Sequence, residues 1–284
     1  MQSLAWSGHE SVVVQDRVGV VCGQDQGQGR SVMLHVVNRP LSGLGQSYGP
    51  PGDGPFPTVM VLHGSEGAWS GYSYLTAAIL AAHGFLAVPF GYSVGGDVWN
   101  AGDIREVALD RTAEALAMLH NLPLSSKVGL YGVSRGAEHA LLVTSLMVRD
   151  GVAGLPDAVA VHAAPDVICG AFIAASYRDS GDPGWRSWDP AERAWTWRGS
   201  SDALLPTMPI EIERYAGPLF LSHGTLDAIW SVAMTQRLEA RLLRAARTPE
   251  VHLLAGQDHN PHGEDENEHH RRLITFLRQA LGAA

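Results

Sequence analysis

Residues 58–62 (TVMVL) form a continuous apolar run, and this run restricts the fold more than any other feature of the chain. A strand with apolar residues on both faces is typical of a parallel sheet that helices cover on both sides. Further strands are predicted at 85–90, 127–131, 158–162, 218–222 and 251–254, and helices at 72–83, 103–120, 135–149, 232–246 and 266–281. This alternation predicts an α/β fold with a mostly parallel central sheet and helices on both faces.

An N-terminal β extension is predicted ahead of this alternation, over residues 1–57. The segment ends in a stretch rich in Pro and Gly, 38–57, which we expect to be a loop. The Val-rich stretches before it predict short strands at 11–14, 18–22 and 32–37.

An insertion interrupts the alternation over residues 163–216, where no clear strand is visible. Four of the eight tryptophans lie in this segment: Trp185, Trp188, Trp195 and Trp197. A loop of about fifty residues inside a compact domain is either functional or a small subdomain, so we interpret it as a cap. Its tryptophans fit an apolar acyl pocket and a core that holds the cap equally well. All 284 residues are predicted to form a single domain.

Composition excludes several functional classes. The chain has 20 Lys and Arg against 29 Asp and Glu, a net charge of −9 without a basic cluster, which argues against nucleic-acid binding. Cys22 and Cys169 lack a CxxC spacing, so neither a disulfide framework nor a thiolate zinc site is expected. Because no signal peptide and no long apolar span are visible, we expect a cytoplasmic protein without a membrane anchor. No Walker A loop or dinucleotide fingerprint is present, so no cofactor is predicted.

The pattern G-x-S-x-G occurs twice, around Ser93 (GYSVG) and around Ser134 (GVSRG). A nucleophile elbow needs a strand, a sharp turn and a helix that begins at once. Ser134 follows the strand KVGLY and precedes the helical stretch AEHALLVTSLMVRD, whereas further turn residues follow Ser93. We therefore predict Ser134 as the nucleophile and interpret Ser93 as a loop serine.

A serine nucleophile needs a base that an acid orients, and in this type of fold the chain order is Ser, Asp or Glu, His. Asp227 follows the strand at 218–222 and is the predicted acid, with Asp202 as the competitor. His259 lies between the last strand and the last helix and is the predicted base, with His262 in reserve. His252 falls within a strand and is interpreted as structural.

An oxyanion hole is expected where the loop after the first core strand, His63-Gly-Ser-Glu-Gly67, approaches the elbow. The predicted donors are the backbone N–H groups of Arg135 and Ser65, with Glu66 as the alternative one residue later. His63 is interpreted as a structural hydrogen-bonding residue. Trp185, Trp188 and Trp230 are the candidates for the substrate pocket.

With these residues identified, the chain resembles the α/β-hydrolase superfamily over about residues 55–280. Within it, the chain is most similar to the dienelactone hydrolases and to the catalytic domain of the acyl-CoA thioesterase and bile acid-CoA:amino acid N-acyltransferase family. The latter likeness rests on GVSRGAE around Ser134, on the Trp and Ser that follow Asp227 at the family's spacing, and on the loop AGQDH that ends at His259.

Two departures from that family are visible, and the nucleophile bears on the reaction to expect. Only about 55 residues precede the catalytic segment here, too few for the β-sandwich of its animal members. The family's nucleophile is either Cys or Ser, and Ser, as here, favours transfer of the acyl group to water over transfer to an amine. The oxyanion loop reads HGSEG instead of a run of glycines.

The sequence therefore predicts a serine hydrolase of a carboxylic ester or acyl thioester, acting on a small-molecule substrate. A specific acyl-CoA thioesterase or acyltransferase, and a ligand-binding protein without catalysis, are the alternatives. Metal-assisted hydrolysis by the cluster His259, His262, His269 and His270 is disfavoured, because no H-E-x-x-H helix is present. No metal is predicted, and the oligomeric state is left open, with a homodimer as one option.

Overall fold

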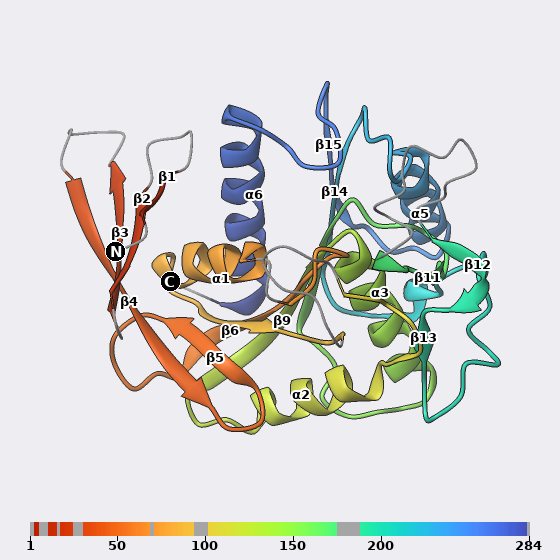
Figure 1. The fold of residues 1–284 in the computed structure, drawn as a ribbon, viewed down its shortest axis with the longest axis horizontal. Helices are drawn as coiled ribbons and strands as arrows, with labels where there is room; N and C mark the ends of the chain where they lie inside the picture. Colours follow the sequence, from red (N-terminus) through yellow and green to blue (C-terminus); the bar gives the residue numbers. More distant parts are fainter. Residues whose placement is uncertain are drawn as a thin grey trace.

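The computed structural model describes residues 3–5, 11–15, 18–24, 31–68, 71–93, 102–174 and 188–282. Within them, one sheet of 11 strands has the order β1-β2-β3-β4-β5-β7-β6-β9-β10-β14-β15 (Figure 1). Its parallel part consists of β7 (Leu86–Phe90), β6 (Phe56–Leu62), β9 (Ser125–Val133), β10 (Ala158–His162), β14 (Leu219–Gly224) and β15 (Glu250–Leu254). The predicted parallel sheet is confirmed.

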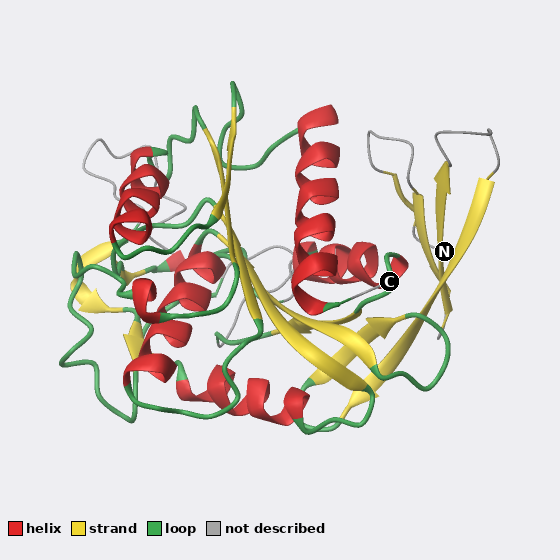
Figure 2. Cartoon of the chain, turned by 180° about the vertical axis from the view of Figure 1, so that it is seen from behind, coloured by secondary structure: helices red, strands yellow, loops and turns green. Residues whose placement is uncertain are grey.

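Helices cover both faces of the parallel strands, as predicted (Figure 2). One face packs against α1 (Tyr72–Ala82) and α6 (Glu264–Leu281), and the other against α2 (Asp110–His120), α3 (Arg135–Arg149) and α5 (Ala233–Arg244). In β6, Val59 and Val61 join the core under α1 and α6, while Met60 and Leu62 join the core under α2 and α3. Successive side chains of a strand point to opposite faces, so a strand buried between two helical layers is apolar throughout.

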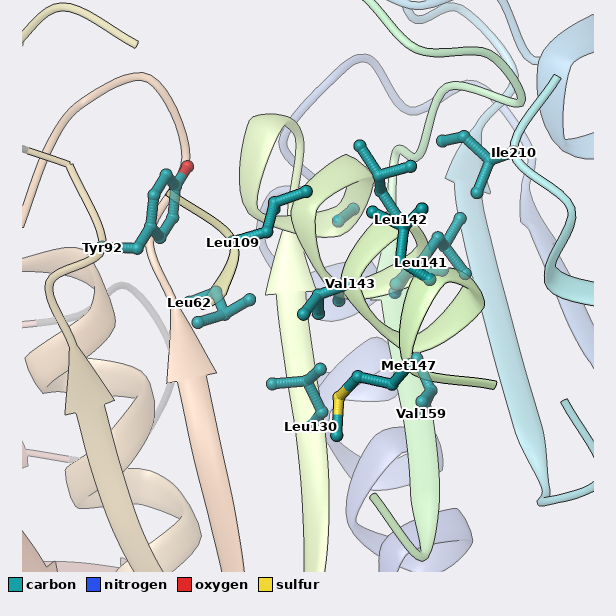
Figure 3. Close-up of a cluster of buried hydrophobic side chains, with 14 of the residues drawn as sticks. Leu62, Tyr92, Leu109, Leu130, Leu141, Leu142, Val143, Met147, Val159 and Ile210 are labelled. Carbon is teal, nitrogen blue, oxygen red and sulfur yellow. The ribbon is translucent and has the colours of Figure 1, made fainter. Parts of the chain in front are cut away.

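The core on the α3 side supports the strand end that carries Ser134. Figure 3 shows Leu130 of β9 and Val159 of β10 next to Val143 and Met147 of α3, and all four side chains are buried. Fully burying such a side chain stabilises a fold by about 1.5–3 kcal/mol, so this contact holds α3 firmly against the sheet.

The N-terminal strands extend the sheet through antiparallel pairing at its β7 edge. They are β1 (Ser3–Ala5), β2 (Ser11–Gln15), β3 (Val18–Gln24), β4 (Ser31–Leu41) and β5 (Gly45–Gly49). The predicted loop at 38–57 is wrong in its first part, because β4 continues to Leu41 and forms a hairpin with β5. Strand β5 of the hairpin also pairs with β7, where Tyr48 lies opposite Ala87. Pairing with a strand distant in the sequence cannot be predicted from the local content of Pro and Gly, so the hairpin was predicted as a loop.

Helix α2 begins at Asp110, seven residues later than predicted. The short strand β8 (Val107–Ala108) precedes it and pairs with β13 (Trp195–Thr196) of the insertion. The carboxylate of Asp103, the first residue of the predicted helix, instead accepts a hydrogen bond from the backbone N–H of Ala174 at 2.8 Å. Contacts with a distant segment thus replace the first predicted turns.

Short strands do occur in the insertion, contrary to the expectation from the sequence. In its described residues, 163–174 and 188–216, β11 (Gly170–Ala171) pairs with β12 (Asp189–Arg193), and η1 (Ile212–Arg214) forms one 3₁₀ turn. Strands of two to five residues leave little periodicity for sequence reasoning to find. Trp195 and Trp197 are buried in the α2 and α3 core, so these two hold the insertion down. Whether the segment acts as a cap stays a prediction.

Candidate active site

Ser134 lies at the turn between β9 and α3, with φ 56° and ψ −119°. Positive φ is sterically unfavourable for a residue with a side chain and persists only where the surrounding structure enforces it. Helix α3 begins with the next residue, Arg135, whose N–H belongs to the first turn and has no acceptor within the helix. The strand, strained turn and immediate helix predicted for Ser134 are all present.

The two glycines of the elbow are required by close approach of the backbone. A Cβ on Gly132 would meet the carbonyl group of Gly136, and a Cβ on Gly136 would meet the carbonyl oxygen of His63. Backbone atoms at such positions cannot move aside in the way that the end of a flexible side chain can. The glycines therefore let β9, α3 and the HGSEG loop pack together around Ser134.

Asp227 and His259 meet at the same edge of the sheet, in the loops after β14 and β15. His259 Nδ1 donates a hydrogen bond to Asp227 Oδ2 at 2.7 Å. Asp227 is buried, and the His259 side chain is partly exposed. Because Ser134 follows β9, all three residues lie beyond the carboxyl ends of parallel strands, where ligands bind in open α/β sheets.

Asp227 is surrounded by hydrogen-bond donors. Its Oδ1 accepts the backbone N–H groups of Ile229 at 2.8 Å and Trp230 at 2.9 Å, and its Oδ2 lies 3.1 Å from His223 Nε2. Burial by itself would raise the pKa of Asp227, but the hydrogen bonds from His223 and His259 outweigh it and hold the pKa well below its usual value. The carboxylate is therefore charged at neutral pH and can orient a histidine.

The sequence reasoning missed His223, although it is the second-last residue of β14, just ahead of the acid loop. It is buried, and its Nε2 also donates to the backbone oxygen of Trp230 at 2.8 Å. Its Nδ1 lies 2.8 Å from Thr235 Oγ1 on α5. A histidine at the end of a strand, four residues ahead of the predicted acid, was the available signal.

Ser134 is linked to the acid and base loops through two further residues. The indole N–H of Trp230 donates to Ser134 Oγ at 3.2 Å. The backbone N–H of Ser134 donates to the carbonyl of His162 at 3.0 Å, and His162 Nε2 donates to the carbonyl of His259 at 3.2 Å. The structure thus brings the nucleophile, acid and base candidates into one connected cluster of loops. The sequence reasoning also missed His162, the last residue of β10.

The HGSEG loop after β6 is held by its own side chains. Glu66 Oε1 accepts the backbone N–H of Gly64 at 2.8 Å, and burial raises the pKa of the Glu66 carboxyl. His63 stacks on Tyr92 with ring centroids 3.9 Å apart, and the Tyr92 hydroxyl donates to the carbonyl of His63 at 2.9 Å. The interpretation of His63 as a structural residue agrees with these contacts.

The alternatives from the sequence lie in other surroundings. Ser93 Oγ is 3.2 Å from His63 Nε2, and the segment that directly follows Ser93 lies outside the described residues. Asp202 is exposed in a turn of the insertion. His262 is largely exposed and 3.5 Å from Asp258, while His252 pairs with Glu250 at 2.6 Å.

The three pocket candidates have different environments. Trp230 is buried against Ser134, and Trp188 is half-buried with its ring against Gly170 of the insertion. Trp185 lies outside the described residues.

Neither a metal site nor a membrane-spanning helix is found among the described residues. No group of three or more His, Cys, Asp or Glu side chains in that part of the chain is arranged to hold a metal ion. Among the helices described, none has the length and apolar character needed to cross a membrane.

Two curated proteins are similar to part of the sequence. Acyl-coenzyme A thioesterase 6 of Mus musculus is 34% identical over 100 residues, and acyl-coenzyme A thioesterase 5 of the same species is 33% identical over 98. Each match covers 34% of this chain and 23% of the relative, so the similarity spans about a quarter of the relatives' length. No family model matches the chain.

Solved structures resemble nearly the whole chain. A bacterial heroin esterase has a TM-score of 0.58 at 18% identity and covers 94% of this chain and 85% of its own. A protein of Klebsiella pneumoniae described as a dienelactone hydrolase has 0.58 at 16%, covering 93% and 100%. Brefeldin A esterase, a bacterial homologue of human hormone sensitive lipase, has 0.54 at 18%, covering 94% and 76%. Together with the sheet order and the elbow, these likenesses show that the chain has the α/β-hydrolase fold.

Proposed function

We propose that the protein is a serine hydrolase that cleaves a carboxylic ester or acyl thioester through Ser134, His259 and Asp227. The observation that supports this best is the strained turn at Ser134, connected through Trp230 to the Asp227–His259 hydrogen bond of 2.7 Å. A strained serine between a strand and a helix directs its hydroxyl beyond the edge of the sheet, and an imidazole held by a carboxylate is suited to take the proton. The esterases among the similar structures are consistent with this chemistry.

In the acylation step, Ser134 Oγ attacks the carbonyl carbon and His259 Nε2 takes the hydroxyl proton. The carbonyl π electrons move onto oxygen and give a tetrahedral oxyanion. When the oxyanion collapses, the bond to the alcohol or thiol breaks, and the histidine returns its proton to the leaving group. Asp227 stabilises the imidazolium that exists between these two events, because its carboxylate stays charged.

In the deacylation step, water replaces the serine as nucleophile. His259 takes a proton from the water, whose oxygen attacks the acyl carbon of the Ser134 ester. Collapse of this second oxyanion breaks the bond between the acyl carbon and Oγ, and the proton passes from His259 to Oγ. A carboxylic acid is released and the free serine is restored.

The oxyanion is proposed to bind two backbone N–H groups, that of Arg135 and that of Ser65 or Glu66. The start of α3 adds the partial positive charge of a helix N-terminus at Arg135. Of the two residues in the HGSEG loop, Ser65 is the first candidate, because the Glu66 side chain already binds the loop backbone at the N–H of Gly64.

The likeness to acyl-coenzyme A thioesterases favours an acyl thioester as a second candidate substrate. A thioesterase for CoA substrates would gain from basic side chains near the site. Arg135 is not available for this role, because its side chain is buried in an ion pair with Glu138. Arg198 lies beside Asp150 at the opposite end of α3 from Ser134. We propose the ester as the first substrate to test, with Trp188 and Trp230 beside the acyl group; the pocket role of Trp185, which lies outside the described residues, stays a prediction from the sequence. A cytoplasmic location and a homodimer are further predictions.

A fluorophosphonate probe tests the proposal directly, since it labels only an activated serine. The wild type is expected to be labelled and to hydrolyse p-nitrophenyl esters, and Ser134→Ala is expected to lose both activities with its fold intact. Ser93→Ala is the matched control, because Ser93 occupies the other G-x-S-x-G motif. An active Ser134→Ala variant, or loss of activity only in Ser93→Ala, would contradict the assignment. Comparing acyl-CoA thioesters with short and long esters then separates the two substrate classes.

A further inference from the structure

Trp230 connects the acid candidate to the nucleophile candidate without passing through His259. Its backbone N–H donates to Asp227 Oδ1 at 2.9 Å, and its backbone oxygen accepts from His223 Nε2 at 2.8 Å. Its indole Nε1 donates to Ser134 Oγ at 3.2 Å. The backbone of Trp230 is therefore held by the acid loop while its side chain reaches the reacting oxygen.

The burial of Trp230 makes this contact specific. The residue is only 2% exposed, so its indole N–H is shielded from water and needs a partner within the protein. Ser134 is also buried, at 7% exposure. A ring held this tightly, with its backbone tied to Asp227, keeps the N–H aimed at Oγ.

The chemistry of the two groups determines the direction of the hydrogen bond. An indole nitrogen can only donate, so Ser134 Oγ must accept with one of its two lone pairs. The hydroxyl proton then points away from Trp230 and is free to face an imidazole. The second lone pair is left for attack on a carbonyl carbon.

We propose that Trp230 is a further catalytic residue, whose indole N–H holds Ser134 Oγ in its reactive orientation and stabilises negative charge on it. This inference rests on the proposed function. Charge builds on Oγ as its proton leaves during attack, and again as the bond between Oγ and the acyl carbon breaks in deacylation. A hydrogen bond to a charged acceptor is about twice as strong as one to a neutral acceptor, so the N–H stabilises these transition states more than the resting hydroxyl.

The test is Trp230→Phe, which removes the indole N–H and leaves the backbone bonds to Asp227 and His223 possible. We expect kcat for a p-nitrophenyl ester to fall about tenfold, with KM within about twofold, because the N–H touches the serine and not the substrate. The rate of labelling by a fluorophosphonate is expected to fall by a similar factor. Trp230→Met, which fills the site with a flexible side chain without a donor, is the second variant and is expected to show the same split.

Trp197→Phe is the matched control. Trp197 is also buried, and its indole N–H donates to Asp150 Oδ2 at 2.7 Å, at the other end of α3. Its loss removes the same chemical group without touching Ser134, so kcat and the labelling rate are expected to stay within twofold of wild type. Thermal unfolding of the variants shows whether they are folded.

The outcomes separate this inference from the proposed function. Wild-type kcat in folded Trp230→Phe and Trp230→Met, with Ser134→Ala inactive, would overturn the role of Trp230 and leave the proposed function standing. A rise in KM with unchanged kcat would reduce Trp230 to a pocket residue and would also overturn it. An active Ser134→Ala variant would overturn the proposed function and this inference together.

Discussion

The guanidinium of Arg135 and the carboxylate of Glu138 lie 2.9 Å apart, and both side chains are buried on the first turn of α3. Arg135 Nη2 also donates to the carbonyl of Gly170 at 2.9 Å. Glu138 Oε1 accepts the backbone N–H of Cys169 and the indole N–H of Trp195, both at 2.7 Å. The first turn of α3, directly after Ser134, therefore binds the insertion to the core of the fold, and Arg135 does so while its backbone N–H is proposed for the oxyanion hole.

Removing one partner of this pair is expected to destabilise the protein strongly. Glu138→Ala leaves the Arg135 charge buried without its carboxylate, which typically costs about 3–5 kcal/mol of unfolding free energy. Urea denaturation measures the loss. Glu268→Ala is the control, since Glu268 pairs with Arg271 and Arg272 on the surface of α6 and its loss should cost less than about 1 kcal/mol. If both substitutions lowered the unfolding free energy equally, the buried pair would contribute no more to stability than the surface pairs.

Asp227→Asn tests the orientation of His259. The amide has roughly the size of the carboxylate but carries no charge, so it no longer stabilises the imidazolium and favours the wrong histidine tautomer. In the serine protease triad this change lowers kcat by about 10⁴, and we expect a loss of several orders of magnitude here with KM little changed. Ester hydrolysis with Asp202→Asn as the control measures the effect. Activity lost in Asp202→Asn and kept in Asp227→Asn would reverse the assignment of the acid.

Gly136→Ala tests the close approach between the elbow and the HGSEG loop. The new Cβ would meet the carbonyl oxygen of His63, so either α3 or the loop must shift. Overpacking of this kind typically costs about 1–3 kcal/mol, and we expect esterase activity to fall by more than stability alone explains, because the loop holds Ser65 and Glu66. Chemical denaturation and kcat, measured on the same preparation, check this. If Gly136→Ala kept the wild-type unfolding free energy and kcat, the backbone around Gly136 and His63 would have to have room for a Cβ, contrary to the structure.

Stability is expected to decrease as the pH falls from about 6.5 to about 4. Burial lowers the pKa of His63 to about 4 and that of His162 to about 3, so both are neutral in the folded protein. In the unfolded chain they titrate near 6.5, and below this pH the unfolded state binds more protons and is favoured. Asp227, whose pKa is lowered in the folded protein, also contributes to the unfolding free energy. This contribution is largely kept down to about pH 4, because an aspartate of the unfolded chain binds a proton only near its pKa of about 3.9.

Urea denaturation at pH 7, 6, 5 and 4 measures this dependence. His162→Gln is expected to make the unfolding free energy less sensitive to pH, whereas His262→Gln, which changes a largely exposed side chain, should leave the slope unchanged. The explanation would be wrong if the unfolding free energy of the wild type did not depend on pH, or if His262→Gln changed the pH dependence more than His162→Gln does.

Much of the fold could be predicted because its signals are local. Helix α3 and strand β10 have the predicted bounds, and the other core elements differ by a few residues at their ends, apart from the late start of α2. Apolar runs, and a helix that begins directly after Ser134, depend on neighbouring residues and can be read along the chain. The hairpin β4–β5 and the strand β8 depend on partners far away in the sequence, and these were missed.

By itself, the sequence determined the α/β-hydrolase architecture and the candidates Ser134, Asp227 and His259, because strand, turn and helix signals place each residue at a strand end. Only the tertiary structure decided which side chains meet there. The contact of Trp230 with Ser134 Oγ, the second histidine on Asp227 and the buried Arg135–Glu138 pair join residues from separate loops and helices. Hydrogen bonds and burial depend on distances across the folded chain, which no local pattern encodes.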